Sequence, residues 1–202
     1  DGVWISGNEK DIKIYSPIDN AWIGSVPAMT KEDVDIVVKS SQNACKKWKA
    51  TTIEERAEIL YRAANILLEQ IDEISSLLVM EIAKDRKSAK SEVERTADFI
   101  KFTADTAKNL SGESIPGDSF PGFKSNKVSI VKREPLGVVL AISPFNYPIN
   151  LAASKIAPGL MAGNTIILKP ATQGSLSGLT LARVFEAAGV PAGVLNTITG
   201  KG

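Results

Sequence analysis

The sequence predicts an α/β fold, because three apolar runs in its last third alternate with helical patterns. The runs are 138–142, 165–168 and 194–198, and each is too short for a core helix and rich in β-branched residues. Apolar stripes at helical spacing lie between them, so the order from 138 to 199 is strand, helix, strand, helix, strand. This order is half of a doubly wound, Rossmann-like parallel sheet. We expect the run 138–142 to be buried on both faces, as strands of parallel sheets are.

The N-terminal 110 residues predict a short β-hairpin followed by helices. The hairpin covers residues 1–28 and turns at Asp19-Asn20. The segments 30–33 and 52–55 have the Thr-x-x-Asp and Thr-x-x-Glu spacing of a capping box, so each opens a helix. Cys45 lies on the apolar stripe of the first helix with no His anywhere in the chain, and we interpret it as a small buried thiol.

Two further helices follow before the composition changes. One runs through 71–82 and ends in the basic run 84–87, which we interpret as a solvated helix end. The next spans about 88–110, and its predicted buried stripe is Val93, Ala97, Ile100 and Ala104.

Residues 111–133 predict an irregular linker and an exposed strand. Gly and Pro interrupt the polar segment 111–126, and 127–133 alternates apolar and basic residues. From the residues alone this region is a linker with an edge hairpin.

The loop 143–148, Ser-Pro-Phe-Asn-Tyr-Pro, follows the first buried strand and precedes a helix. Ligands of open α/β sheets bind at the carboxyl ends of strands, where such loops lie. Pro148 suits the first position of the helix, because it has no N–H to leave unpaired. Asn146 carries a neutral amide donor of the kind an oxyanion hole uses. From spacing alone, an ordinary loop with a helix-capping Asn is the simpler interpretation.

Composition excludes several classes of function. The net charge is +1, from 24 basic and 23 acidic residues, and the sequence has no basic stripe of the kind that would predict nucleic-acid binding. One Cys allows no internal disulfide and fits a reducing cytoplasm. With no His and one Cys, no metal site of the usual ligands is expected. No apolar run approaches the roughly 18 residues that span a membrane.

Several motifs recur in a fixed order along the second half of the chain. They are Glu134-Pro-Leu-Gly-Val-Val-Leu-Ala-Ile-Ser-Pro-Phe-Asn-Tyr-Pro, Lys155-Ile-Ala-Pro-Gly-Leu, Ala162-Gly-Asn-Thr and Lys169-Pro-Ala-Thr. Together they resemble the aldehyde dehydrogenase superfamily. The loop motif, Lys169-Pro-Ala-Thr-Gln-Gly-Ser and Asn196-Thr-Ile-Thr-Gly resemble its non-phosphorylating, NADP-dependent glyceraldehyde-3-phosphate dehydrogenases. The similarity extends over all 202 residues.

The resemblance implies the amino-terminal part of the aldehyde dehydrogenase fold. Residues 1–110 would be the hairpin and helices of the cofactor domain, 111–137 an oligomerisation arm, and 138–202 the first βαβαβ part of the truncated Rossmann-like sheet. The family's nucleophilic Cys, catalytic Glu and glycine-rich loop would lie beyond residue 202. We therefore expect the chain to be inactive by itself.

The resemblance also assigns site residues. Asn146 would be the catalytic oxyanion donor, and Arg95, Asn146 and Tyr147 would bind the substrate. A guanidinium such as that of Arg95 suits a phosphate, since it stays charged and donates two parallel hydrogen bonds.

The cofactor residues implied by the resemblance are Ser143, Pro144, Phe145, Lys169 and Thr172. No G-x-G-x-x-G follows the first strand, so the standard dinucleotide motif is absent from this sequence. Relatives that prefer NAD commonly carry Glu where Thr172 stands, and a carboxylate there would repel a 2′-phosphate. The resemblance therefore favours NADP.

The implied reaction is the glycolytic oxidation of glyceraldehyde 3-phosphate to 3-phosphoglycerate through a Cys thioester. The expected partners are a small-molecule aldehyde, phosphorylated in the resembled enzymes, and further copies of the chain as a dimer or tetramer. Neither nucleic acid nor membrane is expected, and the expected location is the cytoplasm. Two alternatives remain: another NAD(P)-dependent semialdehyde dehydrogenase, or a non-catalytic subunit that pairs through 111–135.

Overall fold

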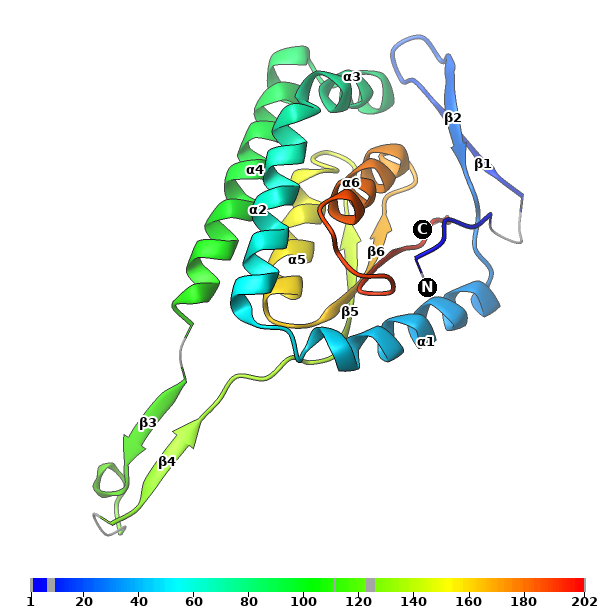
Figure 1. The fold of residues 1–202 in the computed structure, drawn as a ribbon. Helices are drawn as coiled ribbons and strands as arrows, with labels where there is room; N and C mark the ends of the chain where they lie inside the picture. The colour runs from blue at the N-terminus through cyan, green and yellow to red at the C-terminus, as the bar shows by residue number, and fades with distance from the viewer. Residues whose placement is uncertain (1, 7–9, 111, 123–125, 202) are drawn as a thin grey trace.

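The computed structural model describes residues 2–6, 10–110, 112–122 and 126–201 and has an α/β architecture (Figure 1). Its helices are α1 (Lys31–Trp48), α2 (Ile53–Glu69), α3 (Ile71–Ile82), α4 (Arg86–Lys108), α5 (Asn150–Met161) and α6 (Ser175–Ala187), with a short 3-10 turn at Gly117–Ser119. Its strands are β1 (Ile12–Tyr15), β2 (Trp22–Val26), β3 (Glu113–Pro116), β4 (Val128–Val131), β5 (Val138–Ser143), β6 (Thr165–Pro170) and β7 (Leu195–Thr197).

The parallel sheet has the order β5-β6-β7, and the predicted βαβαβ unit is confirmed. β6 is the middle strand and is buried on both faces. The expectation that 138–142 is buried on both faces is wrong, since Leu140 and Ile142 are 57% and 61% exposed. Ala141, between them, packs in the helical core. β5 borders the sheet, and the described residues cover only the face toward which Ala141 points.

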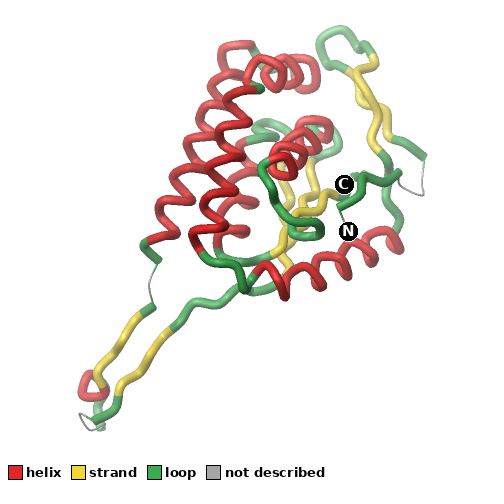
Figure 2. The backbone as a smooth tube through the Cα atoms, viewed as in Figure 1, coloured by secondary structure: helices red, strands yellow, loops and turns green. Residues whose placement is uncertain are grey.

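A layer of helices covers that face of the sheet (Figures 1 and 2). The buried stripe predicted for the fourth helix is confirmed, because its four residues are fully buried against α2, α3 and α5. Both capping boxes are confirmed at Thr30 and Thr52. α4 begins at Arg86, slightly earlier than predicted, because the Asp85 side chain accepts from the Ser88 amide and caps the helix.

The connection between α3 and α4 corrects one interpretation. The basic run 84–87 is not a single solvated helix end: Arg86 and Lys87 begin α4, whereas the side chain of Lys84 is only 11% exposed. The chain reverses through Ala83, whose φ is +53°. After this turn, the Lys84 side chain points toward Glu92 of α4 and the loop 143–148 instead of toward solvent.

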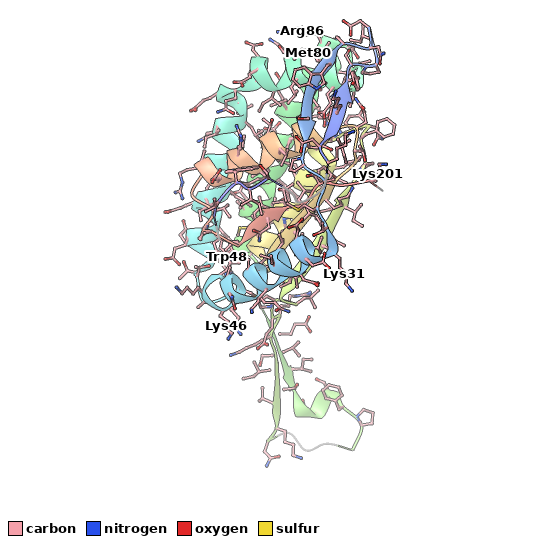
Figure 3. The ribbon with its side chains drawn as sticks, turned by 90° about the vertical axis from the view of Figure 1, so that its right-hand side faces the viewer. Lys31, Lys46, Trp48, Met80, Arg86 and Lys201 are labelled. Carbon is pink, nitrogen blue, oxygen red and sulfur yellow. The ribbon has the colours of Figure 1, made fainter. Side chains whose placement is uncertain are left out.

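α1 lies across the start of the parallel strands (Figure 1). Trp48, labelled in Figure 3, is fully buried there, and its Nε1 donates to the Leu160 carbonyl at 3.2 Å. Cys45, predicted to be buried, is partly exposed on the same helix and is a free thiol.

Strands β3 and β4 form an antiparallel hairpin that projects from the body, as two perpendicular views show (Figures 1 and 3). It lies within the predicted arm 111–137, of which residues 111 and 123–125 are outside the described residues. All four residues of β4 are exposed, although three of them are apolar. The hairpin predicted within residues 1–28 is confirmed over residues 12–26 as β1 and β2, with Asn20 in the turn at φ +57°. Residues 2–6 form no strand, and residues 1 and 7–9 lie outside the described residues.

Among the described residues, no helix has both the length and the apolar composition needed to cross a membrane.

Candidate functional site

The loop 143–148 stands at the carboxyl end of β5, level with the end of β6. Ser143 pairs in register with Pro170, so the loops that follow the two strands begin at the same edge of the sheet. Pro144, Phe145 and Asn146 are exposed on this edge. Within the described residues the side-chain amide of Asn146 makes no hydrogen bond, so both of its N–H groups can serve a ligand.

α5 holds the far side of this loop. The Leu151 amide donates to the Tyr147 carbonyl at 2.9 Å, so helical pairing begins at Tyr147 and places Pro148 in the first helical position. This agrees with the prediction for Pro148, although the assigned helix starts at Asn150.

A buried carboxylate accepts hydrogen bonds from the first amides of α5. Glu92 of α4 has a fully buried side chain, and its Oε1 accepts from the Ile149 and Asn150 amides at 3.0 and 3.1 Å. Its Oε2 pairs with the Lys84 ammonium. The helix N-terminus is thereby paired with a negative charge, as the alignment of peptide dipoles favours.

Lys84 extends this network into the loop. Its Nζ donates to the Asn146 carbonyl at 2.9 Å and lies 3.7 Å from the centroid of the Tyr147 ring. A cation over an aromatic face is attracted by the ring quadrupole. The two loop residues predicted to meet the substrate are therefore both in contact with one ammonium group.

A cavity of about 270 Å³ opens beside the loop, lined by Glu92, Arg95, Tyr147, Asn150 and Leu151. Arg95 and Tyr147 come from α4 and from the loop before α5, about fifty residues apart in sequence, and the fold brings them to one cavity. Arg95 is exposed and forms no ion pair with a described residue. Its guanidinium can therefore receive an anion.

The predicted cofactor residues gather at the same edge of the sheet. Burial lowers the pKa of Lys169 from its usual value. Its Nζ donates to the Pro170 carbonyl at 3.0 Å, and in the described part of the chain no carboxylate pairs with it. A partly dehydrated cation without a counter-ion fits a phosphate-bearing ligand such as NADP.

Thr172 and Ser143 differ in how they could contribute. The Thr172 hydroxyl donates to the Gly200 carbonyl at 3.2 Å, which ties the loop after β6 to the segment after β7. The Ser143 hydroxyl is buried and has no hydrogen-bond partner among the described residues. Ser143 as a whole is only 2% exposed, so the structure offers no open face of this residue to a ligand.

The N-terminus of α6 is also closed by a carboxylate. Glu81 of α3 is fully buried and accepts from the amides of Gly174, Leu176 and Ser177 at 3.1, 2.8 and 2.9 Å. In standard dinucleotide folds, a pyrophosphate lies at such a helix start. Here protein carboxylates hold the starts of α5 and α6, in keeping with the absent glycine motif.

Sequence reasoning missed Glu81, Lys84 and Glu92. The signal for both Glu residues was present, because each lies on the buried stripe of its helix, after Leu78 in α3 and between Ala89 and Thr96 in α4. A carboxylate on an apolar stripe requires buried hydrogen-bond partners.

A larger hollow of about 560 Å³ lies between the segment 3–5, α1 and α6. Its one titratable lining residue among those described is Glu186, whose Oε2 accepts from Trp4 Nε1 at 2.8 Å. The described lining of this hollow therefore has no group of charged side chains like the one beside the loop 143–148. In the described ranges no three His, Cys, Asp or Glu side chains cluster as metal ligands would.

Comparison with known proteins identifies the family of this chain. The model of the aldehyde dehydrogenase family matches residues 4–202. The chain belongs to the aldehyde dehydrogenase family. A crystal structure of an NADP-dependent glyceraldehyde-3-phosphate dehydrogenase from Bacillus halodurans C-125, complexed with NADP, superposes with a TM-score of 0.97 at 48% identity. It is covered over 42% of its length, and all of this chain is matched. The described fold is the N-terminal part of the aldehyde dehydrogenase fold.

Curated members of the family show the same pattern. An NADP-dependent glyceraldehyde-3-phosphate dehydrogenase of Streptococcus equinus is 54% identical over 201 residues, and one of Triticum aestivum is 44% identical over 205. Each alignment covers all of this chain but only 42% and 41% of the relative. The chain spans about two fifths of the length of the curated relatives it matches.

Proposed function

We propose that this chain is the N-terminal part of an enzyme that oxidises glyceraldehyde 3-phosphate to 3-phosphoglycerate with NADP and without phosphorylation. The observation that carries the proposal is the shared cavity of Arg95 and Tyr147 beside the free amide of Asn146. Similarity to relatives named for this activity supports it.

Each residue of the site has a defined part in this proposal. Arg95 would bind the substrate phosphate through charge-assisted hydrogen bonds, and the Tyr147 hydroxyl would add a polar contact. Asn146 would donate to the aldehyde oxygen as negative charge develops on it, when a thiolate from beyond residue 202 attacks the carbonyl carbon. The tetrahedral adduct would become a thioester once its hydride has passed to the cofactor, and water would then hydrolyse the thioester to the acid.

NADP would accept the hydride when bound. Pro144 and Phe145 are exposed where the loop would face it, and Lys169 would supply positive charge near the 2′-phosphate. Thr172 places a hydroxyl instead of a carboxylate on this edge, so no negative charge at that position opposes the phosphate.

The β3–β4 hairpin would serve as an oligomerisation arm that pairs with another copy of the chain. Its outer edge and its exposed apolar residues Val128 and Ile130 support this role, because an unpaired apolar strand edge is a liability unless another strand covers it. A homodimer or homotetramer would result. The single Cys fits a location in the cytoplasm.

The decisive experiment replaces Arg95 with Ala in the full-length protein and compares glyceraldehyde 3-phosphate with unphosphorylated glyceraldehyde. Losing a charge-assisted contact to phosphate removes about 1.5–3 kcal/mol, so kcat/KM for the phosphorylated aldehyde should fall by about 10- to 100-fold. The plain aldehyde should be affected by less than about threefold.

Lys101→Ala, a cation removed from the same helix away from the cavity, should leave both substrates unchanged. Equal losses on the two aldehydes in the Arg95 variant would reject the phosphate assignment. They would favour a dehydrogenase for a non-phosphorylated aldehyde.

A further inference from the structure

Lys84 and Glu92 form the most buried ion pair in the described part of the chain. Their side chains are 11% and 0% exposed, whereas those of the pair Lys90–Asp72 are 42% and 70% exposed. A buried pair gains little net stability over well-packed apolar side chains, because both ions lose their hydration. Stability alone is therefore a weak reason for this pair.

Every contact of the pair leads to the candidate site. Glu92 accepts from the first two amides of α5 through one oxygen and from Lys84 through the other. Lys84 in turn donates to the Asn146 carbonyl and lies against the Tyr147 ring. The ammonium thus connects a fixed helix start to the two loop residues that would meet the substrate.

Within the part of the chain that the structure describes, no other polar contact fixes the centre of the loop. In the described residues, the bond from Lys84 is the only hydrogen bond made by the main chain of Phe145 and Asn146. The prolines at 144 and 148 limit the backbone angles but anchor no atom. The position of the Asn146 amide along the loop therefore depends on Lys84.

We propose that Lys84 and Glu92 are positioning residues that hold the Asn146 amide and the Tyr147 ring in the geometry the reaction requires. Glu92 holds the ammonium, and the ammonium holds the loop. This inference rests on the proposed function for its catalytic consequence, but the loop anchoring is a property of this chain alone. A donor moved by about 1 Å from its productive place costs roughly 100-fold in rate.

The test uses the full-length protein with Lys84→Met, which keeps the length of the side chain and removes its charge and donors. We expect kcat to fall by about 10- to 100-fold, with KM for NADP changed by less than about threefold. Glu92→Gln keeps the size of the side chain and an acceptor for the α5 amides, but removes the negative charge that holds Lys84. It should lower kcat in the same direction by about 10-fold.

A double-mutant cycle separates positioning from general damage. If Lys84 acts through Asn146, Lys84→Met should cost clearly less in an Asn146→Ala background than in the unmodified protein, because one of the two groups that it positions is already gone and only its effect through Tyr147 is left. Lys90→Met removes the exposed ion pair between α4 and Asp72 of α3 and should leave kcat unchanged. Equal losses from Lys84→Met in both backgrounds would overturn the inference.

Amide hydrogen exchange provides a readout that needs no activity. Lys84→Met and Glu92→Gln should speed exchange in peptides that cover 145–151, whereas Lys90→Met should not. Unchanged exchange in the two site variants would refute the anchoring, even if activity were lost. If the unmodified full-length protein oxidised no aldehyde while the two site variants still exchanged faster at 145–151, the proposed function would be rejected and the anchoring supported.

Discussion

Two buried glutamates, Glu81 and Glu92, illustrate how single residues organise this fold. Each comes from the layer of α3 and α4 and receives the first amides of a helix that follows a parallel strand. Buried carboxylates are rare unless hydrogen-bonded, and hydrogen bonds to a charged acceptor are each stronger than neutral ones. At the residue scale, these carboxylates align α5 and α6 with the sheet.

Glu81→Gln should lower the melting temperature of the full-length protein. The amide cannot accept from all the donors that Glu81 serves, and one buried N–H left facing another costs about 1–3 kcal/mol. Differential scanning calorimetry measures the shift. Glu94→Gln, the same change at an exposed position on α4, should leave the melting temperature unchanged, and equal shifts would contradict the argument.

Lys169 predicts how cofactor preference depends on pH. Because burial lowers its pKa below 10.5, the ammonium loses its proton at a lower pH than an ordinary lysine would. Only the protonated form attracts the 2′-phosphate, so affinity for NADP should weaken relative to NAD as pH rises from about 7 to about 10. Titration calorimetry with both cofactors tests this. Lys169→Gln should make the ratio independent of pH, and a pH-independent ratio in the unmodified protein would refute the assignment.

At the scale of elements, local sequence signals were sufficient to predict the features that depend on a single helix or strand. Residues close together in the sequence determine the helix caps at Thr30 and Thr52 and the buried stripe of α4. They also determine where the three parallel strands lie along the chain. Burial of β5 was mispredicted because strand order, which local pattern does not contain, made it a border. Lys84 was misread because its partners lie 8 and 62 residues away.

For the candidate site too, some features could be predicted from local sequence and others could not. Asn146 and Tyr147 could be proposed as site residues from the loop motif, because both lie in that one short segment. The motif cannot show that Arg95 meets Tyr147 in a cavity, because that contact depends on how α4 packs against α5. Nor does it show what anchors the loop.

The β3–β4 hairpin carries a prediction of its own. Val128 and Ile130 lie on one face of β4 and are 65% and 71% exposed. If the arm pairs between copies, Ile130→Asp should place a charge in that contact and dissociate the assembly. Analytical ultracentrifugation measures the mass in solution. Ser129→Asp, which points to the opposite face, should preserve the assembly, and an intact Ile130→Asp oligomer would refute pairing through this face.

At the largest scale, the parallel sheet of the described residues has β5 at one side and β7 at the other, and Leu140 and Ile142 lie on its exposed face. The one thiol, Cys45, belongs to α1, which crosses the opposite ends of the strands from the loop 143–148 (Figure 1). The described residues therefore place no thiol beside the proposed donor and binding groups.

Cys45→Ser in the full-length protein should leave aldehyde oxidation within about twofold of the unmodified rate, because its thiol does not reach the loop. Residues 1–202 alone should form no NADPH from any aldehyde. Absorbance of the reduced cofactor follows both reactions. A rate lost with Cys45, or turnover by residues 1–202, would refute this division of labour.

The anchoring of α5 and α6 by Glu92 and Glu81 has a consequence for engineering and for evolution. Both carboxylates lie outside the βαβαβ segment that they serve, so this segment is not a transferable module. Grafted onto another α/β scaffold, it would present two helix starts with no anion to receive them. An exchange of halves between such enzymes should succeed only when the α3–α4 layer travels with the strands.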